Sequence, residues 1–373
     1  MASHREDLLA ARSVDVPGPG VLAVLPGEGV GPAVVAAALQ VLEALADAGG
    51  PSFELRQGGP IGLEAEARDG RPLSDGVEAL CAEVFAAGGV VLAGPGGGRF
   101  VYDLRGRFDL FYKLSPLRVA DELAGATRLR AEHVRGVDVL VVRENASGFY
   151  HGRWRMTRDE RGERRAEHRL EVSEADVRRL LEVAAARAAQ RRGHLAVVVK
   201  PAGIPAVSEL WVECAREIAG EAGLEWSTLE VDHAAYHLVQ RPHELDVVAA
   251  PDLFGDVLAD LGGVLLGSRG LTYSGNFSSS GAAVYQTNHG AAHDIAGTDR
   301  ANPAGQILSL AMLLEESFGL PDEAALVREA LSATWRAGWR TPDIAEPDTR
   351  VVGTRAFAEL TADAVAELAR RSP

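Results

Sequence analysis

The sequence is poor in the features that mark membrane, disulfide-bonded and nucleic-acid-binding proteins. No apolar run approaches the roughly 18 residues that a membrane-spanning helix needs. Cysteine occurs only at Cys81 and Cys214, both in apolar segments of helical composition, so we expect buried thiols rather than a disulfide or a metal pair. The 53 acidic residues outnumber the 38 basic ones, and the net charge of −15 excludes an overall basic surface for nucleic acid.

The N-terminal segment has no apolar signal region. Its charged residues, among them Arg5 and Asp7, argue against a signal peptide, so we expect a cytoplasmic protein. Residues 1–20 end in Pro17-Gly18-Pro19-Gly20 and are expected to form a loose leader. The chain of 373 residues, 47% of them hydrophobic, is long enough for roughly two domains.

Short apolar runs alternate with segments of helical composition after residue 20. The runs predicted as strands are Val21–Leu25, Val90–Ala93, Val137–Val142, Leu195–Lys200 and Val247–Ala250. The segments predicted as helices are Pro32–Ala48, Ser74–Ala87, Ser173–Arg191, Ser208–Ala222 and three more after Asn302 (Ile307–Phe318, Glu323–Trp339 and Ala356–Ala369). This alternation predicts an α/β fold. The polar segment from Trp154 to His168 is expected to be a solvated arm, with pairing to a second subunit as an open alternative.

A pair of aspartates points to a metal ion. Asp256 and Asp260 are four residues apart, so a helix would place them on one face. Two carboxylates so close repel each other, and a bound cation would offset that repulsion. Oxygen ligands favour Mg²⁺ or Mn²⁺ over zinc. A solvated helix face is the alternative.

Two glycine-containing loops could approach a nucleotide. The loop from His289 to Gly297 would let its backbone lie close to a phosphate or ribose. The turn Pro26–Pro32 follows a predicted strand and opens a helix, but its glycine spacing differs from the dinucleotide-binding pattern. A tight strand-to-helix turn explains that second loop equally well.

Basic residues near the ends of predicted strands could bind carboxylates. Arg143 closes an apolar run, and Arg105 and Lys113 lie beside the segment Asp109–Pro116. Arginine binds carboxylates through two parallel hydrogen bonds, so this group suits a di- or tricarboxylic acid. Surface ion pairing is the alternative.

Tyr150 and Lys200 are candidates for proton transfer. Tyr150 lies beside a flexible loop and could be a general acid if a nearby cation lowers its pKa. Lys200 ends a run of valines, and burial there would depress its pKa and suit it to acid–base work. A packed tyrosine and an ordinary surface lysine are the alternatives.

Taken together, these residues resemble the isopropylmalate/isocitrate dehydrogenase family of β-decarboxylating dehydrogenases. The resemblance covers about residues 21–320 and is strongest from Val231 to Phe318. It implies a two-domain α/β fold with a central mixed sheet flanked by helices. The larger, nucleotide-binding domain would hold residues 21–105 and 252–373, and the smaller, dimerisation and substrate domain residues 106–251, including an arm at 151–170.

The resemblance also implies a reaction and its residues. A 2-hydroxy acid would be oxidised by NAD and then decarboxylated, with Mg²⁺ or Mn²⁺ stabilising the enolate. Lys200 would be the base, Tyr150 the acid, and Arg105 and Arg143 the substrate arginines. The implied metal ligands are Asp232, Asp256 and Asp260, and the implied NAD-binding residues are His289, Gly290, Asp294, Ile295 and Asn302. Asp232 and Lys200 would come from the second subunit of a homodimer with shared active sites.

The sequence departs from the family in its substrate region. Ser115 stands where the family has a substrate arginine, and Lys113 could supply its charge without the same two-pronged geometry. Ala202 replaces an asparagine that follows the catalytic lysine, and Val101-Tyr102 replaces a leucine pair that would receive an isopropyl group. We therefore expect an unusual 3-substituted malate, in a specialised biosynthetic pathway.

Three alternatives remain open at this point. The first is 3-isopropylmalate dehydrogenase of leucine biosynthesis. The second is a non-catalytic regulatory homologue, which the losses at Ser115 and Ala202 favour and the retained Tyr150 and Lys200 oppose. The third is a dehydrogenase that does not decarboxylate its product.

Overall fold

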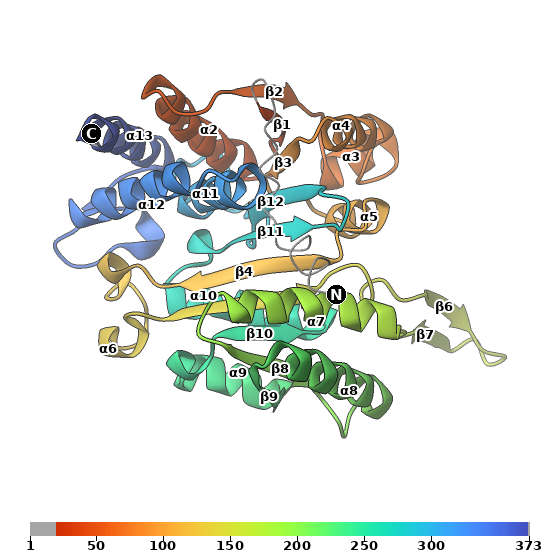
Figure 1. Ribbon diagram of the computed structural model, residues 1–373. Helices are drawn as coiled ribbons and strands as arrows, with labels where there is room; N and C mark the ends of the chain where they lie inside the picture. Colours follow the sequence, from red (N-terminus) through yellow and green to blue (C-terminus); the bar gives the residue numbers. More distant parts are fainter. Residues whose placement is uncertain (1–19, 372–373) are drawn as a thin grey trace.

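A single ten-stranded sheet organises the molecule (Figure 1). The computed structural model describes residues 20–371. The strands lie in the order β2-β1-β3-β12-β11-β4-β5-β10-β8-β9. Their bounds are β1 (Gly20–Leu25), β2 (Phe53–Gln57), β3 (Val90–Ala93), β4 (Tyr112–Arg118), β5 (Asp138–Glu144), β8 (His194–Val199), β9 (Glu225–Glu230), β10 (Val247–Ala250), β11 (Tyr273–Phe277) and β12 (Ala283–Thr287). The predicted α/β fold with a central mixed sheet is confirmed.

The sheet is mixed because two antiparallel strands lie at its middle. β11 pairs antiparallel with both β12 and β4, and β4 pairs antiparallel with β5. All other neighbours in the sheet are parallel. Parallel strands need long crossover connections, and helices supply them here. The boundary predicted between two domains falls between β11 and β4, and the division itself stays a prediction.

Helices cover the sheet along its length. They are α2 (Gly31–Asp47), α3 (Gly62–Asp69), α4 (Asp75–Ala86), α5 (Phe100–Arg107), α6 (Ala131–Val134), α7 (Glu174–Ala189), α8 (Pro205–Ala222), α9 (Val231–Gln240), α10 (Asp252–Leu266), α11 (Ala304–Phe318), α12 (Pro321–Arg336) and α13 (Thr354–Arg371). The C-terminal α13 packs along α2, so the two ends of the described chain lie in the same half of the molecule (Figure 1).

Local sequence explains where several of these helices begin. The Ser74 hydroxyl accepts a hydrogen bond from Val77 N and caps α4. Ser173 and Asp176 form a capping box at the start of α7. Proline occupies the first turn of α2, α8 and α12, where its missing N–H costs nothing. The serine caps satisfy backbone N–H groups that the helices leave free, and each proline removes one such group.

The arm is a β-hairpin that projects from the body of the molecule (Figure 1). It consists of β6 (Trp154–Arg158) and β7 (Arg164–His168), which pair antiparallel. Trp154 and Met156 on β6 are exposed large hydrophobic residues. A solvated arm accounts for the charged residues of this hairpin, but it does not account for the exposure of Trp154 and Met156.

The prediction of buried thiols is confirmed. Cys81 and Cys214 are buried, free thiols, and burial raises the pKa of Cys81 to about 12. Within residues 20–371, no helix is long and apolar enough to cross a membrane. The predicted leader, apart from residue 20, lies outside the described residues. Residue 20 itself begins β1.

Candidate active site

The candidate site is built around Arg143 at the carboxyl end of β5. Its guanidinium donates to Asp252 Oδ1 at 2.9 Å and also pairs with Asp256, and both aspartates lie on α10. The Arg143 side chain is only 2% exposed, whereas that of Asp256 is 42% exposed. Arg143 therefore anchors the first two turns of α10 and leaves one carboxylate open to solvent.

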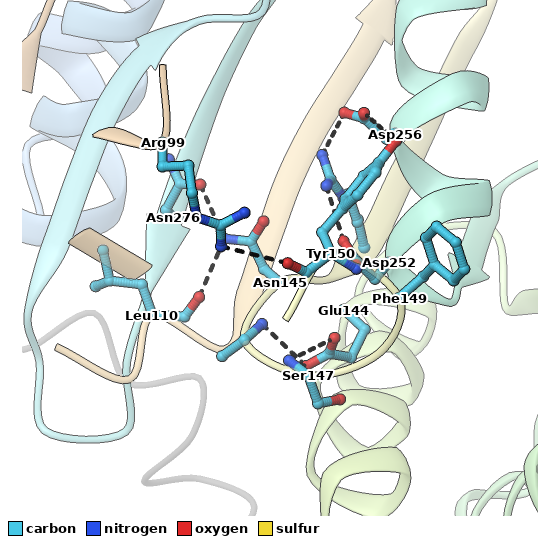
Figure 2. Close-up of polar contacts among 12 residues, drawn as sticks. Arg99, Leu110, Glu144, Asn145, Ser147, Phe149, Tyr150, Asp252, Asp256 and Asn276 are labelled. Carbon is cyan, nitrogen blue, oxygen red and sulfur yellow. Dashed lines mark hydrogen bonds and ion pairs between the residues drawn. The ribbon is translucent and has the colours of Figure 1, made fainter. Parts of the chain in front are cut away.

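Tyr150 completes this cluster from the loop that follows β5 (Figure 2). Its backbone N–H donates to Asp252 Oδ2 at 2.8 Å, and its hydroxyl donates to Asp256 Oδ2 at 3.1 Å. The Arg143 guanidinium carbon lies 5.6 Å from the centre of the Tyr150 ring. Asp252 thus positions both Arg143 and Tyr150.

In the described chain the pKa of Tyr150 is raised, and a pKa lowered by a bound metal ion stays a prediction. Burial and the neighbouring Asp256 raise the pKa of Tyr150, and these effects exceed the opposing influence of Arg143. The phenol therefore keeps its proton firmly. This is the state that a proton donor requires before it acts.

Two further cations lie near Arg143 without a carboxylate partner. Arg105 and Lys113 are 4% and 5% exposed, and within residues 20–371 neither side chain makes a hydrogen bond or ion pair. Lys113 lies directly opposite Arg143 in the β4–β5 pairing. Burial, followed by repulsion from Arg143, lowers the pKa of Arg105 to about 9. Burial, followed by Arg105, lowers the pKa of Lys113 well below its usual value.

Ser115 lies two residues farther along β4, on the same face as Lys113. It is completely buried, and its hydroxyl accepts a hydrogen bond from Asn288 Nδ2 at 3.4 Å. The position that the family fills with an arginine is therefore occupied by a small neutral side chain. The positive charge on β4 that lines the cleft is that of Lys113.

A cleft of about 820 Å³ borders this cluster. Its lining includes Lys113, Asp256, Asp260 and Asn288. Asp256 and Asp260 both lie on α10, which confirms the prediction that a helix carries this pair. Asp260 pairs with Arg269 at 2.9 Å and remains about half exposed. Two cleft-facing carboxylates are oxygen donors of the kind that Mg²⁺ and Mn²⁺ prefer, so these residues fit a divalent cation.

Asp232 and Lys200 lie apart from this pair. Lys200 Nζ contacts Asp232 at 2.7 Å and Glu230 at 2.8 Å, and the side chains of Lys200 and Asp232 are 31% and 72% exposed. Among residues 20–371, no three His, Cys, Asp or Glu side chains meet in a metal-binding group. One described chain therefore brings together two of the three expected metal ligands.

The pKa of Lys200 is likewise raised in one described chain, and its depression in a site shared by two subunits stays a prediction. Hydrogen bonds with Asp232 and Glu230 raise the pKa of Lys200, and Lys200 lowers the pKa of Asp232. The valine run ends before Lys200, whose side chain leaves the apolar interior. Within one chain, the burial on which the expectation depended does not occur.

The predicted NAD-binding residues lie on the loop between β12 and α11. Asp294 and Gly290 are exposed, while Ile295 packs against the small apolar cluster of Val30, Val34 and Ala301. His289 has its pKa lowered by burial. Asn302 is buried just before α11. Its side-chain oxygen accepts from Ala304 N at the start of α11, and its side-chain nitrogen donates to Asp343. Asn302 thus holds the end of the loop in place.

The glycine-rich turn after β1 supports this loop. Val30 N donates to the Ala291 carbonyl at 2.8 Å, and a Cβ on Gly29 would lie 1.9 Å from that oxygen. Gly29 also has a φ of +59°, which favours glycine. The Glu28 carboxylate accepts from Glu64 N and Gly97 N. The turn therefore acts as a scaffold for the His289–Gly297 loop.

Sequence reasoning missed Asp252, which holds both Arg143 and Tyr150. The signal was present, because Asp252, Asp256 and Asp260 are spaced four residues apart after the buried run Val247–Ala250. It also missed His151, which lies next to Tyr150 and has a buried Nε2 with no partner in the described chain.

Comparison with known proteins identifies the family. The family model described as isocitrate/isopropylmalate dehydrogenase matches residues 21–361. The 3-isopropylmalate dehydrogenase of Halalkalibacterium halodurans is 36% identical over 92% of this chain and 97% of that protein. The corresponding enzyme of Aquifex aeolicus is 35% identical over 90% of this chain and 94% of its own length.

A solved structure agrees with this assignment. The isocitrate dehydrogenase from Methylococcus capsulatus superposes with a TM-score of 0.82 at 30% identity, covering 93% of this chain and 99% of that one. Both the sequence match and the structural match therefore extend over nearly the whole chain. The protein belongs to the isocitrate/isopropylmalate dehydrogenase family and is an NAD-dependent, decarboxylating oxidoreductase that acts on a CH–OH group with Mg²⁺ or Mn²⁺.

Proposed function

We propose that the protein oxidises and decarboxylates a 3-substituted malate. The observation that carries this proposal is the pair of buried cations, Arg105 and Lys113, which have no carboxylate partner among the described residues. An unpaired buried charge is costly and persists where a ligand compensates it. A malate offers two negatively charged carboxylates, one for each of these two positively charged side chains.

The roles of the residues follow from their positions. Arg105 and Lys113 bind substrate carboxylates, and Arg143 lies behind them as a third positive charge. Ser115 brings no positive charge to the substrate, so Arg105 and Lys113 supply it. Tyr150 holds a proton at its hydroxyl and delivers it to the substrate carbon after CO₂ departs.

Asp256 and Asp260 hold the divalent cation at the edge of the cleft. When bound, that cation stabilises negative charge that develops on substrate oxygen. Arg143 keeps Asp256 oriented toward the cleft, and Asp252 keeps Arg143 in place. The Asp294 carboxylate accepts hydrogen bonds from the ribose hydroxyls of NAD and would repel a 2′-phosphate.

The site is completed by a second copy of the chain. Asp232 is exposed on α9, and Lys200, which contacts it, is half-buried. Helices α9 and α10 pack together, and their exposed apolar residues include Tyr236, Val257 and Val264. An apolar face of this kind suits an isologous dimer contact. Across such a contact, Asp232 becomes the third metal ligand and Lys200 the base that removes the hydroxyl proton. A cytoplasmic, homodimeric enzyme is the proposed form.

Leucine biosynthesis is the second candidate for the pathway. The relatives cited above carry the name 3-isopropylmalate dehydrogenase, which favours it. Ser115 and Tyr102 favour a different C3 substituent and with it a specialised pathway. The retained Arg105, Tyr150 and paired aspartates argue against a non-catalytic homologue.

The experiment is a substrate screen with NAD and Mn²⁺ that measures NADH and CO₂ together. Malate, tartrate, isocitrate and 3-isopropylmalate form the panel, and Lys113→Met is the variant that removes one unpaired cation. We expect equal amounts of NADH and CO₂ from at least one 3-substituted malate, and at least about a 10-fold loss of kcat/KM in the variant. NADH without CO₂ would indicate a simple dehydrogenase, and no NADH from any acid would refute the proposal.

A further inference from the structure

Tyr102 on α5 lies beside the centre of the candidate active site. Its ring centre is 5.4 Å from that of Tyr150 and 6.0 Å from that of His151, with edge-on geometry in both cases. Its neighbour Val101 packs instead against the apolar cluster that contains Phe100 and Leu104. Of the two residues, only Tyr102 therefore contacts the catalytic tyrosine.

The surroundings of Tyr102 are cationic rather than aliphatic. The guanidinium carbons of Arg99 and Arg105 lie 5.2 Å and 5.6 Å from the centre of its ring. Arg99 also donates to the backbone carbonyl of Tyr150 at 3.5 Å, which brings it over the same loop (Figure 2). The Tyr102 hydroxyl has no hydrogen-bond partner within residues 20–371. Arg99 also pairs with Asp103 at 3.7 Å, so it and Arg105 bring two guanidinium groups close to the Tyr102 phenol.

His151 adds a second unsatisfied polar group to this region. Its Nε2 atom is buried, and it has no partner in the part of the chain that the structure describes. Buried polar atoms are nearly always hydrogen-bonded, so an orphaned one next to a reaction centre points to a ligand. Burial lowers the pKa of His151, an effect that Asp252 opposes and that Arg105 and Arg99 reinforce. A neutral imidazole can accept from a hydroxyl, and a protonated one can donate to a carboxylate.

We propose that Arg99, Tyr102 and His151 form the subsite for the C3 substituent, and that this substituent carries a hydrogen-bonding oxygen rather than a branched alkyl group. The inference rests on the proposed function, because it assigns the C3 substituent of the same malate. An isopropyl group placed there would displace water from His151 and Tyr102 without replacing their hydrogen bonds. A site built for polar recognition discriminates strongly against an analogue that lacks the polar group.

The test compares three C3 substituents by kcat/KM with NAD and Mn²⁺. Tartrate carries a hydroxyl, isocitrate a carboxymethyl group and 3-isopropylmalate an alkyl group. We expect tartrate or isocitrate to exceed 3-isopropylmalate by at least about 10-fold. The better of the two oxygen-bearing acids then separates a hydroxyl from a carboxylate. A wild-type preference for 3-isopropylmalate would overturn the inference.

Variants of the subsite sharpen this comparison. The double variant Tyr102→Leu, His151→Phe is expected to lose at least about 10-fold in preference for the oxygen-bearing acid, whereas His151→Gln retains most of it. Arg99→Met should shift preference in the same direction, and Arg56→Met on the distant edge strand β2 should not. Equal loss on all three acids would mean that these side chains support the fold only, which contradicts the inference.

A binding measurement separates this inference from the proposed function. If no acid in the panel yields NADH, the proposed function fails, and the subsite is judged by ligand-induced shifts in Tm with NADH and Mn²⁺ present. A larger Tm shift with tartrate or isocitrate than with 3-isopropylmalate, abolished in the double variant, would uphold the subsite. A larger shift with 3-isopropylmalate would overturn it.

Discussion

Gly255 on α10 lies directly against Arg143 at the end of β5. A Cβ atom at Gly255 would come within 2.7 Å of Arg143 Cγ and 2.8 Å of Arg143 Cβ. Cβ and Cγ are the first two atoms of the arginine side chain, and they can move little. Because Gly255 has no side chain, Arg143 packs directly against α10 and reaches both Asp252 and Asp256 on that helix.

Replacing Gly255 should therefore damage the site more than the fold. We expect Gly255→Ala to lower kcat/KM by at least about 10-fold, because Arg143 and the carboxylates it orients would shift by a fraction of an ångström or more. Steady-state kinetics and thermal unfolding measure the two effects. Gly220→Ala on α8, where a Cβ would meet open space, is the matched control: it should leave kcat/KM unchanged and raise Tm slightly, because alanine favours a helix over glycine. An unchanged kcat/KM in Gly255→Ala would contradict this account of Arg143.

Lys113 should contribute to activity at the expense of stability. It is buried opposite Arg143, so Lys113→Met removes both desolvation and like-charge repulsion. We expect the free energy of unfolding to rise by about 1 kcal/mol or more while KM for the substrate rises at least about 10-fold. Denaturant titration and kinetics test the two halves separately. Lower stability in Lys113→Met would mean that the lysine is satisfied within the protein.

Glu144 makes the stability of the protein depend on pH. Burial raises the pKa of its carboxyl group from 4.5 to about 7, despite hydrogen bonds from Ala146 N and Ser147 N. The folded state thus binds a proton more tightly than the unfolded state, and this contribution is lost as pH rises from about 4.5 through 7. The loss amounts to about 3 kcal/mol.

The variant Glu144→Gln should lack that loss. The difference in unfolding free energy between Glu144→Gln and the wild type should therefore grow in favour of the variant between pH 5 and pH 8, as measured by urea titration at each pH. Glu359→Gln, at an exposed position on α13, should show no such trend. A difference that is constant with pH would refute the shifted pKa.

Metal dependence should centre on Asp260. Its partner in the described chain, Arg269, is exposed, so Asp260→Asn is expected to cost little stability. The variant should need at least about 10-fold more Mn²⁺ for half-maximal activity, because one of the charged ligands is lost. Chelation with EDTA should abolish wild-type NADH formation, and added Mn²⁺ should restore it. Asp348→Asn, in an exposed turn far from the cleft along the chain, is the control. An unchanged Mn²⁺ requirement in Asp260→Asn would exclude it as a ligand.

The parts of the fold with simple sequence patterns were predictable. Continuous valine-rich runs marked β5, β8 and β10, and Ser74 marked the start of α4. The strand β4 was missed because Lys113, Ser115 and Pro116 interrupt its apolar pattern. Of these three residues, Lys113 lines the cleft beside Asp256 and Asp260. Sequence periodicity reports burial in a core, and it fails where a strand faces a polar site.

The site was predictable where helical spacing governs it. Asp256 and Asp260 followed from a four-residue interval, but Asp252 one turn earlier was overlooked. The protonation behaviour of Tyr150 and Lys200 was not predictable, because it depends on Asp256, Asp232 and Glu230, which other elements bring close. Neighbours of this kind are known only once the chain is folded.

The central claim is that one active site is assembled from two copies of the chain. Lys200→Met and Tyr150→Phe each inactivate every site in a homodimer, but a mixed dimer would contain one site with both wild-type residues. After unfolding and refolding an equal mixture, half of the dimers are mixed and half of their sites are intact, so about a quarter of wild-type activity should return. Activity no greater than that of the separate variants would contradict the shared site.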